Sequence, residues 1–149
     1  MLDMKLLIVD DEEELLENME YDLKKDIKSI IVARNGVEAL RKLKTAKVDC
    51  IITDINMPKK NGIQFAKEAR EWGYNLPIIF LTAHGDDSLM KKALTLNSFD
   101  FIDKPYDKSS LVSVLEEALT ESQELQSNLQ REQSKDNEFQ KAYLELIDK

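Results

Sequence analysis

The sequence has one cysteine, no excess of basic residues and no long apolar run, and each absence narrows the class of protein. Cys50 has no second thiol with which to form an internal disulfide, and its place in an apolar run favours a buried thiol in a reducing compartment. No apolar stretch approaches the roughly 18 residues of a membrane span, and the apolar run at residues 6–9 is too short for a signal peptide. We therefore expect a cytoplasmic protein without a membrane partner.

The charge balance of the chain is acidic. Asp and Glu number 29 against 21 Lys and Arg, so the formal net charge is -8. Binding to DNA or RNA needs a basic surface that replaces phosphate counterions, so direct contact with nucleic acid is disfavoured. The hydrophobic fraction of 42% supports a packed core, and 149 residues suffice for one domain plus an appendage.

Short apolar runs recur along the chain, and each is followed by a segment with helical spacing. The runs are Lys5–Asp10, Ser29–Ala33, Asp49–Asp54, Pro77–Thr82 and Phe99–Ile102. The first, third and fourth are nearly continuous rather than alternating, which is typical of strands buried on both faces of a parallel sheet. The alternation predicts an α/β fold, a doubly wound (βα)5 domain with five parallel strands. The strand order 2-1-3-4-5 is adopted from flavodoxin-like folds rather than worked out from this sequence.

Apolar positions in the intervening segments share helical faces. They are Leu15, Leu16, Met19 and Leu23; Val37, Leu40 and Leu43; Ile63, Ala66, Ala69 and Trp72; Leu89, Ala93 and Leu96; and Leu111, Val114, Leu115 and Ala118. Asn35-Gly36 and Asn61-Gly62 are turn signals just ahead of the second and third of these helices.

Polar side chains that can carry chemistry stand where the expected strands end. They are Asp10 and Asp11, Asp54, Thr82 and Lys104. In an open parallel sheet the carboxyl ends of the strands meet on one side, where ligands bind, so we expect these groups to converge. Three clustered carboxylates repel one another, and a hard divalent cation with oxygen ligands, best fitted by Mg²⁺, relieves the repulsion. A carboxylate in such a site can attack phosphorus while the metal and an ammonium neutralise the transferring group.

The motifs around these residues resemble those of a response-regulator receiver domain. Residues 7–12 (LIVDDE) resemble its acidic pair, and Asp54–Pro58 with Gly62 resembles the phospho-acceptor signature D-x-x-M-P-x-x-x-G. Residues 81–83 (LTA) resemble the switch-threonine motif, and Lys104-Pro105 resembles the Lys-Pro pair, which in receivers often has a cis peptide. The resemblance covers roughly residues 4–120, and the motifs fall in order on the expected elements.

The resemblance implies a role for each matching residue. Asp54 would accept a phosphoryl group from the phosphohistidine of a sensor histidine kinase or a phosphotransfer protein, assisted by Lys104. Asp11 would bind Mg²⁺ directly, Asp10 mainly through water and Asn56 through its backbone carbonyl, and Asp54 would also belong to the metal site.

A switch is also implied. Thr82 would move toward the phosphoryl group, and Phe101, at the position of the switch aromatic, would follow. This would change the face formed by the fourth helix, the fifth strand and the fifth helix, and so control a protein partner or self-association. Beyond its phosphorylation and dephosphorylation at Asp54, the domain would not be an enzyme.

Plainer interpretations stand beside these roles. Asp10 and Asp11 could simply cap a helix, and Thr82 is a residue type common in strands. His84, the single histidine, lies two positions beyond Thr82; it is either a solvated loop residue or, together with Asn56, a group flanking the attacking water and tuning the lifetime of the phosphoryl group.

The chain beyond residue 120 differs from the rest. We expect a receiver-like domain over residues 1–120 and a helical extension over residues 121–149, which contains no glycine or proline. Apolar residues recur every seven positions, with acids in the middle, in two series: Leu111, Ala118, Leu125, Glu132, Phe139 and Leu146; and Leu115, Ser122, Leu129, Asp136 and Tyr143. This pattern favours a long helix that pairs with a second copy as a coiled coil; the alternative is a helical linker or tail that awaits a partner.

Two other functions remain open on the sequence. The first is a Mg²⁺-dependent phosphatase with an aspartyl nucleophile. Such enzymes carry sequences that resemble D-x-D-x-T at the end of the first strand, whereas here the acids Asp10 and Asp11 are adjacent. A phosphorylation-independent scaffold would have a degenerate site, whereas every key residue is present.

Overall fold

The computed structural model describes residues 1–83 and 100–124. Strands and helices alternate along the described chain, as the apolar runs predict. In order they are β1 (Leu2–Val9), α1 (Glu13–Leu23), β2 (Ile27–Ala33), α2 (Gly36–Thr45), β3 (Cys50–Asp54), α3 (Gly62–Glu71), β4 (Ile78–Thr82) and β5 (Asp100–Asp103). A further helix occupies residues 108–124. The fourth helix expected around residues 89–96 lies outside the described residues.

The five strands form one parallel sheet in the order β2-β1-β3-β4-β5, which confirms the expected topology. Strand β1 starts at Leu2, earlier than its apolar run indicates. Leu2 pairs with Ile27, and the register then shifts before Lys5 pairs with Ser29. Because the polar residue Asp3 lies within this irregular stretch, the apolar pattern does not reveal the start of the strand.

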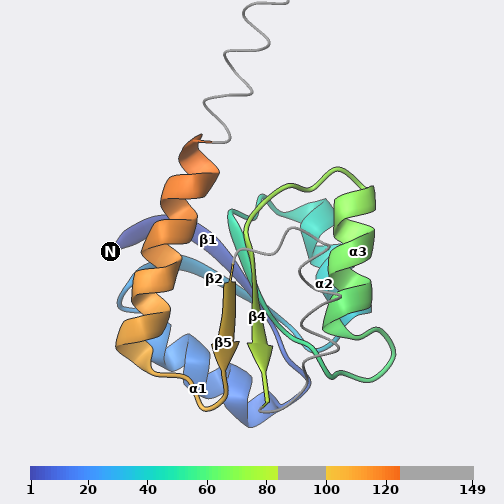
Figure 1. Ribbon diagram of the computed structural model, residues 1–149, viewed down its shortest axis with the longest axis horizontal. Coiled ribbons are helices and arrows are strands. Elements are labelled where there is room, and N and C mark those ends of the chain that lie inside the picture. Colours follow the sequence, from blue (N-terminus) through green and yellow to red (C-terminus); the bar gives the residue numbers. More distant parts are fainter. Residues whose placement is uncertain (84–99, 125–149) are drawn as a thin grey trace, which may run out of the picture.

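Alternate residues of the central strands face two separate cores. In Figure 1, α1 and the 108–124 helix lie on one side of the sheet, and α2 and α3 lie on the other. The first core joins Leu6 and Ile8 of β1 to α1 and the 108–124 helix, and the second joins Leu7 and Val9 to α2 and α3. Cys50 is fully buried in the first core, and burial raises the pKa of its thiol, as an inert structural cysteine requires.

The two Asn-Gly pairs mark helix starts, as predicted. The Asn35 side chain accepts a hydrogen bond from the Glu38 backbone N–H, and Asn61 forms a capping box with Gln64. Placing Val37 on the buried face of α2 was wrong, because Val37 is 43% exposed. Residues three apart drift about 60° per step around a helix, so Val37 lies well away from the side on which Leu43 is buried.

The 108–124 helix packs on the domain from which it extends. The Asp107 carboxylate accepts the Ser110 backbone N–H at 3.0 Å, which caps its first turn. Leu111, Leu115 and Ala118 are fully buried in the first core, and Ser122 is also buried. These residues begin the two sevenfold series, so the described part of the repeat packs on the sheet of its own chain. Residues 125–149, on which the predicted pairing depends, lie outside the described residues.

Candidate functional site

The three predicted acidic residues meet at the carboxyl end of the sheet. Asp10 and Asp11 follow β1, and Asp54 is the last residue of the neighbouring strand β3. One carboxylate oxygen from each lies within 4.8 Å of the others. Asp10 and Asp54 are buried, with 1% and 7% exposure, whereas Asp11 is exposed. The cluster therefore has two members enclosed by protein and one that faces solvent.

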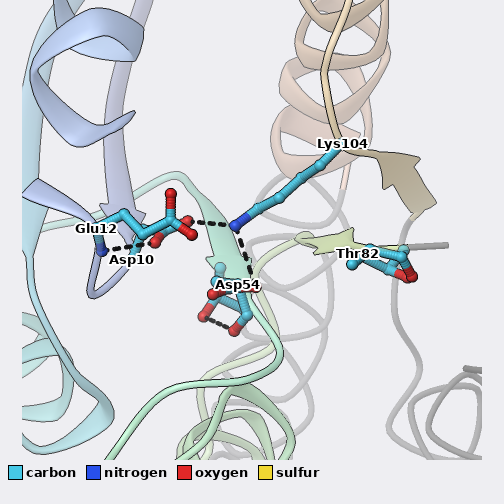
Figure 2. A network of polar contacts seen from close by, with 7 residues as sticks. Asp10, Glu12, Asp54, Thr82 and Lys104 are labelled. Atoms are coloured by element: carbon cyan, nitrogen blue, oxygen red, sulfur yellow. Dashed lines mark hydrogen bonds and ion pairs between the residues drawn. The ribbon is translucent and has the colours of Figure 1, made fainter. Parts of the chain in front are cut away.

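Lys104 joins this cluster from the segment that follows β5. Figure 2 shows its side chain pointing between Asp10 and Asp54. Its Nζ lies 3.0 Å from the Asp10 Oδ2 and 3.4 Å from the Asp54 Oδ1. The backbone N–H of Lys104 donates to the Thr82 carbonyl at 2.9 Å, which anchors the segment to the end of β4. The Lys104-Pro105 peptide is cis, in agreement with the receiver resemblance.

The carboxylate of Asp10 is held from two sides. Its Oδ1 accepts the Glu12 backbone N–H at 2.9 Å, while its Oδ2 accepts from Lys104. The N-cap residue of α1 is Glu12, and no side-chain hydrogen bond caps this helix. Helix capping by Asp11, the plainer interpretation of this acid, is therefore not what the structure shows.

Burial and oppositely charged neighbours shift the pKa values of the site residues in opposite directions. The pKa of Asp54 is raised to about 6, first by burial and then by the negative charge of Asp10, while Lys104 opposes the rise. Burial also raises the pKa of Asp10, against the hydrogen bonds from Glu12 and Lys104. For Lys104, burial alone would lower the pKa, but the hydrogen bond to Asp10 and the nearby carboxylate charges outweigh it and raise the pKa. One ammonium thus does not compensate the acids that surround it.

The donor set fits a hard divalent cation. It consists of carboxylate oxygens from three residues, two of them withdrawn from water and one open to it. Mg²⁺ takes oxygen ligands, commonly from one or two carboxylates, and keeps several waters, which an exposed Asp11 permits. Asn56 lies two residues beyond Asp54 and is exposed, so its backbone carbonyl as a ligand stays a prediction.

A glycine packs against the backbone of Asp54, and this close contact explains part of the sequence signature. A Cβ atom on Gly62 would stand only 2.0 Å from the Asp54 carbonyl oxygen, so any side chain there would displace the backbone of Asp54. The Gly62 N–H also donates to the Ile55 carbonyl at 2.8 Å and closes the loop. The sequence marks Gly62 as a turn signal and as part of the acceptor signature; its close contact with Asp54 depends on the fold.

The remaining predicted site residues are placed as follows. Thr82 ends β4 and is 4% exposed, and Figure 2 shows it on the other side of Asp54 from Asp10. Its hydroxyl donates to the Ala83 carbonyl at 2.8 Å rather than to Asp54. Phe101 lies in β5, partly buried, and its ring stacks on Phe80 with centroids 5.8 Å apart. His84 lies outside the described residues, so its role in tuning stays untested.

A second charged region lies at the amino end of the sheet. A cavity of about 500 Å³ there is lined by Lys5, Lys28, Lys47, Asp49 and Ser122, among others. Its charges are largely solvated or already paired: Lys28 and Asp3 form an ion pair at 3.4 Å, and the Asp49 carboxylate accepts the Lys5 backbone N–H. It does not include any of the predicted site residues.

Comparison with known proteins agrees with this fold. Residues 6–116 match the model of the response regulator receiver domain. The chain is 32% identical over 116 residues to the chemotaxis protein CheY of Halobacterium salinarum, covering 78% of this chain and 97% of that one. A response regulator receiver domain protein from Clostridium thermocellum has a similar structure, with a TM-score of 0.76 at 27% identity, covering 82% of this chain and 98% of the other.

The chain belongs to the response regulator receiver domain family, whose members act in two-component signalling. It is also 35% identical over 105 residues to the alkaline phosphatase synthesis transcriptional regulatory protein PhoP of Bacillus subtilis, covering 70% of this chain. The chain spans only 44% of that relative, so its match extends to less than half of the transcriptional regulator. The absence of direct contact between this chain and nucleic acid stays a prediction. Among the described residues, no helix is both long and apolar enough to cross a membrane.

Proposed function

We propose that this domain accepts a phosphoryl group on Asp54 from a phosphohistidine, in a Mg²⁺-dependent reaction, and thereby signals to a protein partner. The observation that carries the proposal is the position of Asp54. It lies buried between an acidic pair and a lysine, with an oxygen 3.4 Å from the Lys104 Nζ. Family membership supports the same conclusion, since the acceptor signature continues from Asp54 to Gly62.

The residues of the chain divide the work of the transfer. An Asp54 carboxylate oxygen attacks phosphorus, the phosphorus–nitrogen bond of the donor breaks, and the departing imidazole keeps the bonding electrons and takes up a proton. Because the pKa of Asp54 is about 6, most of the acceptor is ionised at neutral pH. Lys104, already directed at Asp54, neutralises charge on the transferring oxygens. Asp10, Asp11 and Asp54 would hold Mg²⁺, which when bound would supply further charge neutralisation.

Thr82 gives the acceptor site a movable donor. Its hydroxyl is satisfied by the Ala83 carbonyl, so turning toward a phosphoryl oxygen exchanges one hydrogen bond for a charge-assisted one. Phe101 follows on β5, whose Asp103 pairs with Thr82 in the sheet register. The proposed result is a shift in the surface around β5, recognised by the partner.

The proposed self-association cannot use the part of the sevenfold repeat that the structure describes. Leu111, Leu115, Ala118 and Ser122 are buried against the domain. Pairing of two copies through the sevenfold repeat would therefore use residues beyond 124.

The test of the proposal is the intact mass of the protein after incubation with a small acyl phosphate and Mg²⁺. We expect one added phosphoryl group, lost in Asp54→Asn and when Mg²⁺ is chelated. Asp49→Asn is the matched control: it changes the acid that precedes the same strand, at the opposite end of the sheet, and keeps an acceptor for the Lys5 N–H. A phosphoryl group that persists in Asp54→Asn, or none in the natural chain, would contradict the proposal.

A further inference from the structure

The five residues that follow β5 form a strap, residues 104–108, that touches three parts of the molecule. Lys104 contacts the buried carboxylates at the carboxyl end of the sheet. Tyr106 and Lys108 reach α1 and the turn that follows it, where they contact Asp22 and Asp26. Asp107 caps the 108–124 helix. A lysine that must stand between two carboxylates is thus carried on a short segment with its own anchors.

The strongest of these anchors is the hydrogen bond from the Tyr106 hydroxyl to Asp22. The Tyr106 oxygen lies 2.6 Å from the Asp22 Oδ2, a short distance typical of a hydroxyl donating to an ionised acceptor. Both residues are half-buried, and the Tyr106 ring packs against the first core. Burial and the charge of Asp22 raise the pKa of Tyr106, so the phenol keeps its proton. The weaker contact, Lys108 to Asp26 at 3.7 Å, is largely solvated.

The strap is fixed on both sides of the lysine side chain. The Lys104 N–H is tied to the Thr82 carbonyl at 2.9 Å, and two residues later the Tyr106 hydroxyl is tied to α1. A charge-stabilising group acts fully only when it is held within fractions of an ångström of its working position. Removing the Tyr106 anchor leaves the backbone of Lys104 tied at the Thr82 carbonyl, with the next contacts of the strap only at Asp107 and Lys108.

We propose that Tyr106 is a positioning residue for Lys104, acting through its hydrogen bond to Asp22 on α1. The inference rests on the proposed phosphoryl transfer to Asp54, in which Lys104 neutralises charge. It assigns to Tyr106 and Asp22 a part in the rate of that transfer although neither residue contacts the site. The proposed Mg²⁺ ligands Asp10, Asp11 and Asp54 do not belong to the strap, so losing this hydrogen bond leaves the ligands in place, and moving the Lys104 charge away from them does not weaken their affinity for the metal.

The experiment compares Tyr106→Phe with the natural chain in the rate of Asp54 phosphorylation by a small acyl phosphate, over a series of Mg²⁺ concentrations. Tyr106→Phe removes the hydroxyl and keeps the ring. We expect the rate at saturating Mg²⁺ to fall about fivefold, because Lys104 is held less firmly in its working position, while the Mg²⁺ concentration at half-maximal rate does not rise. The control is Tyr21→Phe, which changes an exposed tyrosine on the same helix α1 and should keep the natural rate.

Variants of Asp22 separate positioning from a general loss of stability. Asp22→Ala removes the acceptor and should slow phosphorylation as Tyr106→Phe does, whereas Asp22→Asn keeps an acceptor oxygen and should restore most of the rate. The double variant Tyr106→Phe with Asp22→Ala should be no slower than the slower single variant. Rates are measured well below the unfolding transition of each variant, so that the unfolded fraction does not enter.

Several outcomes would overturn the inference. They are an unchanged rate in Tyr106→Phe, an equal loss in Tyr21→Phe, a rise in the Mg²⁺ midpoint, or additive losses in the double variant. Failure of the proposed function is distinguishable, because then the natural chain itself takes up no phosphoryl group. In that case the side-chain NMR signals of Lys104 still decide the positioning claim: they shift in Tyr106→Phe and not in Tyr21→Phe if the strap holds the lysine, and stay in place if it does not.

Discussion

Charged residues gather at both ends of the sheet, and the two ends place them in opposite surroundings. At the amino end, the Lys28 and Asp3 side chains are paired at 3.4 Å while remaining 66% and 85% exposed. At the carboxyl end, Asp10 and Asp54 are almost fully buried, and the side chain of Lys104 between them is only 19% exposed. Water screens the charges at the amino end, whereas the charges at the carboxyl end are compensated only by neighbouring protein groups.

The difference supports the proposal that the carboxyl end of the sheet carries the chemistry. An exposed ion pair costs little to form and contributes little to stability. Buried like charges destabilise a fold, as the raised pKa of Asp54 shows, and they are retained where a function needs them. In the metal-free domain, the charges at the carboxyl end therefore lower the free energy of unfolding, and those at the amino end do not. Three substitutions test this contrast.

The largest effect is expected from Lys104→Met. The change leaves the buried carboxylates of Asp10 and Asp54 without their cation, so the free energy of unfolding should fall by about 3 kcal/mol at pH 7 to 8 in chelator. Urea denaturation followed by circular dichroism measures the loss. The loss should shrink toward pH 4, where protonation removes the stranded charges. An equal loss at both pH values would mean that Lys104 stabilises the fold by packing rather than by charge.

An effect of opposite sign and intermediate size is expected from Asp54→Asn. The folded pKa of Asp54, about 6, lies above its usual value of 3.8, so the folded state binds the proton more tightly. This contribution to stability is complete below pH 4 and is lost as the pH rises through 6. At pH 7 to 8 without metal, the neutral amide should therefore stabilise the domain by about 2 to 3 kcal/mol relative to Asp54.

The pH profile of this gain is its decisive feature. The difference in free energy of unfolding between Asp54→Asn and the natural chain should approach zero near pH 4, and urea midpoints at several pH values measure it. Asp49→Asn, at the amino end, should show no such rise between pH 4 and 7. A gain that does not depend on pH would contradict the assigned burial cost.

The fold could be predicted because burial leaves a direct trace in the sequence. The runs around Leu7, Ile52 and Phe80 are continuous because both faces of these strands are covered, and the two Asn-Gly pairs mark helix starts. What the pattern did not reveal is local. The irregular start of β1 has a polar residue at Asp3, and a spacing of three misplaced Val37.

The site was predictable to the extent that it follows from topology. Asp10, Asp54 and Lys104 end or follow strands that a parallel sheet brings together, so their convergence needs no detailed coordinates. The Tyr106–Asp22 hydrogen bond joins residues 84 positions apart on the surface of two different elements. No periodicity or motif pairs such residues, because their contact depends on how α1 and the strap pack. The constraint on Gly62 was hidden for the same reason.

The smallest effect is expected from Lys28→Met at the amino end. The Lys28–Asp3 pair is exposed on both sides, so each charge is well solvated alone, and breaking the pair should change the free energy of unfolding by less than about 0.5 kcal/mol. Lys28→Met removes the same ammonium, by the same substitution, as Lys104→Met at the opposite end. Urea denaturation of both variants, side by side at pH 7 to 8, therefore isolates the surroundings of the charge from the change itself. A loss for Lys28→Met that matches the loss for Lys104→Met would show that burial does not distinguish the two ends. The acceptor signature would then be the remaining argument for placing function at the carboxyl end.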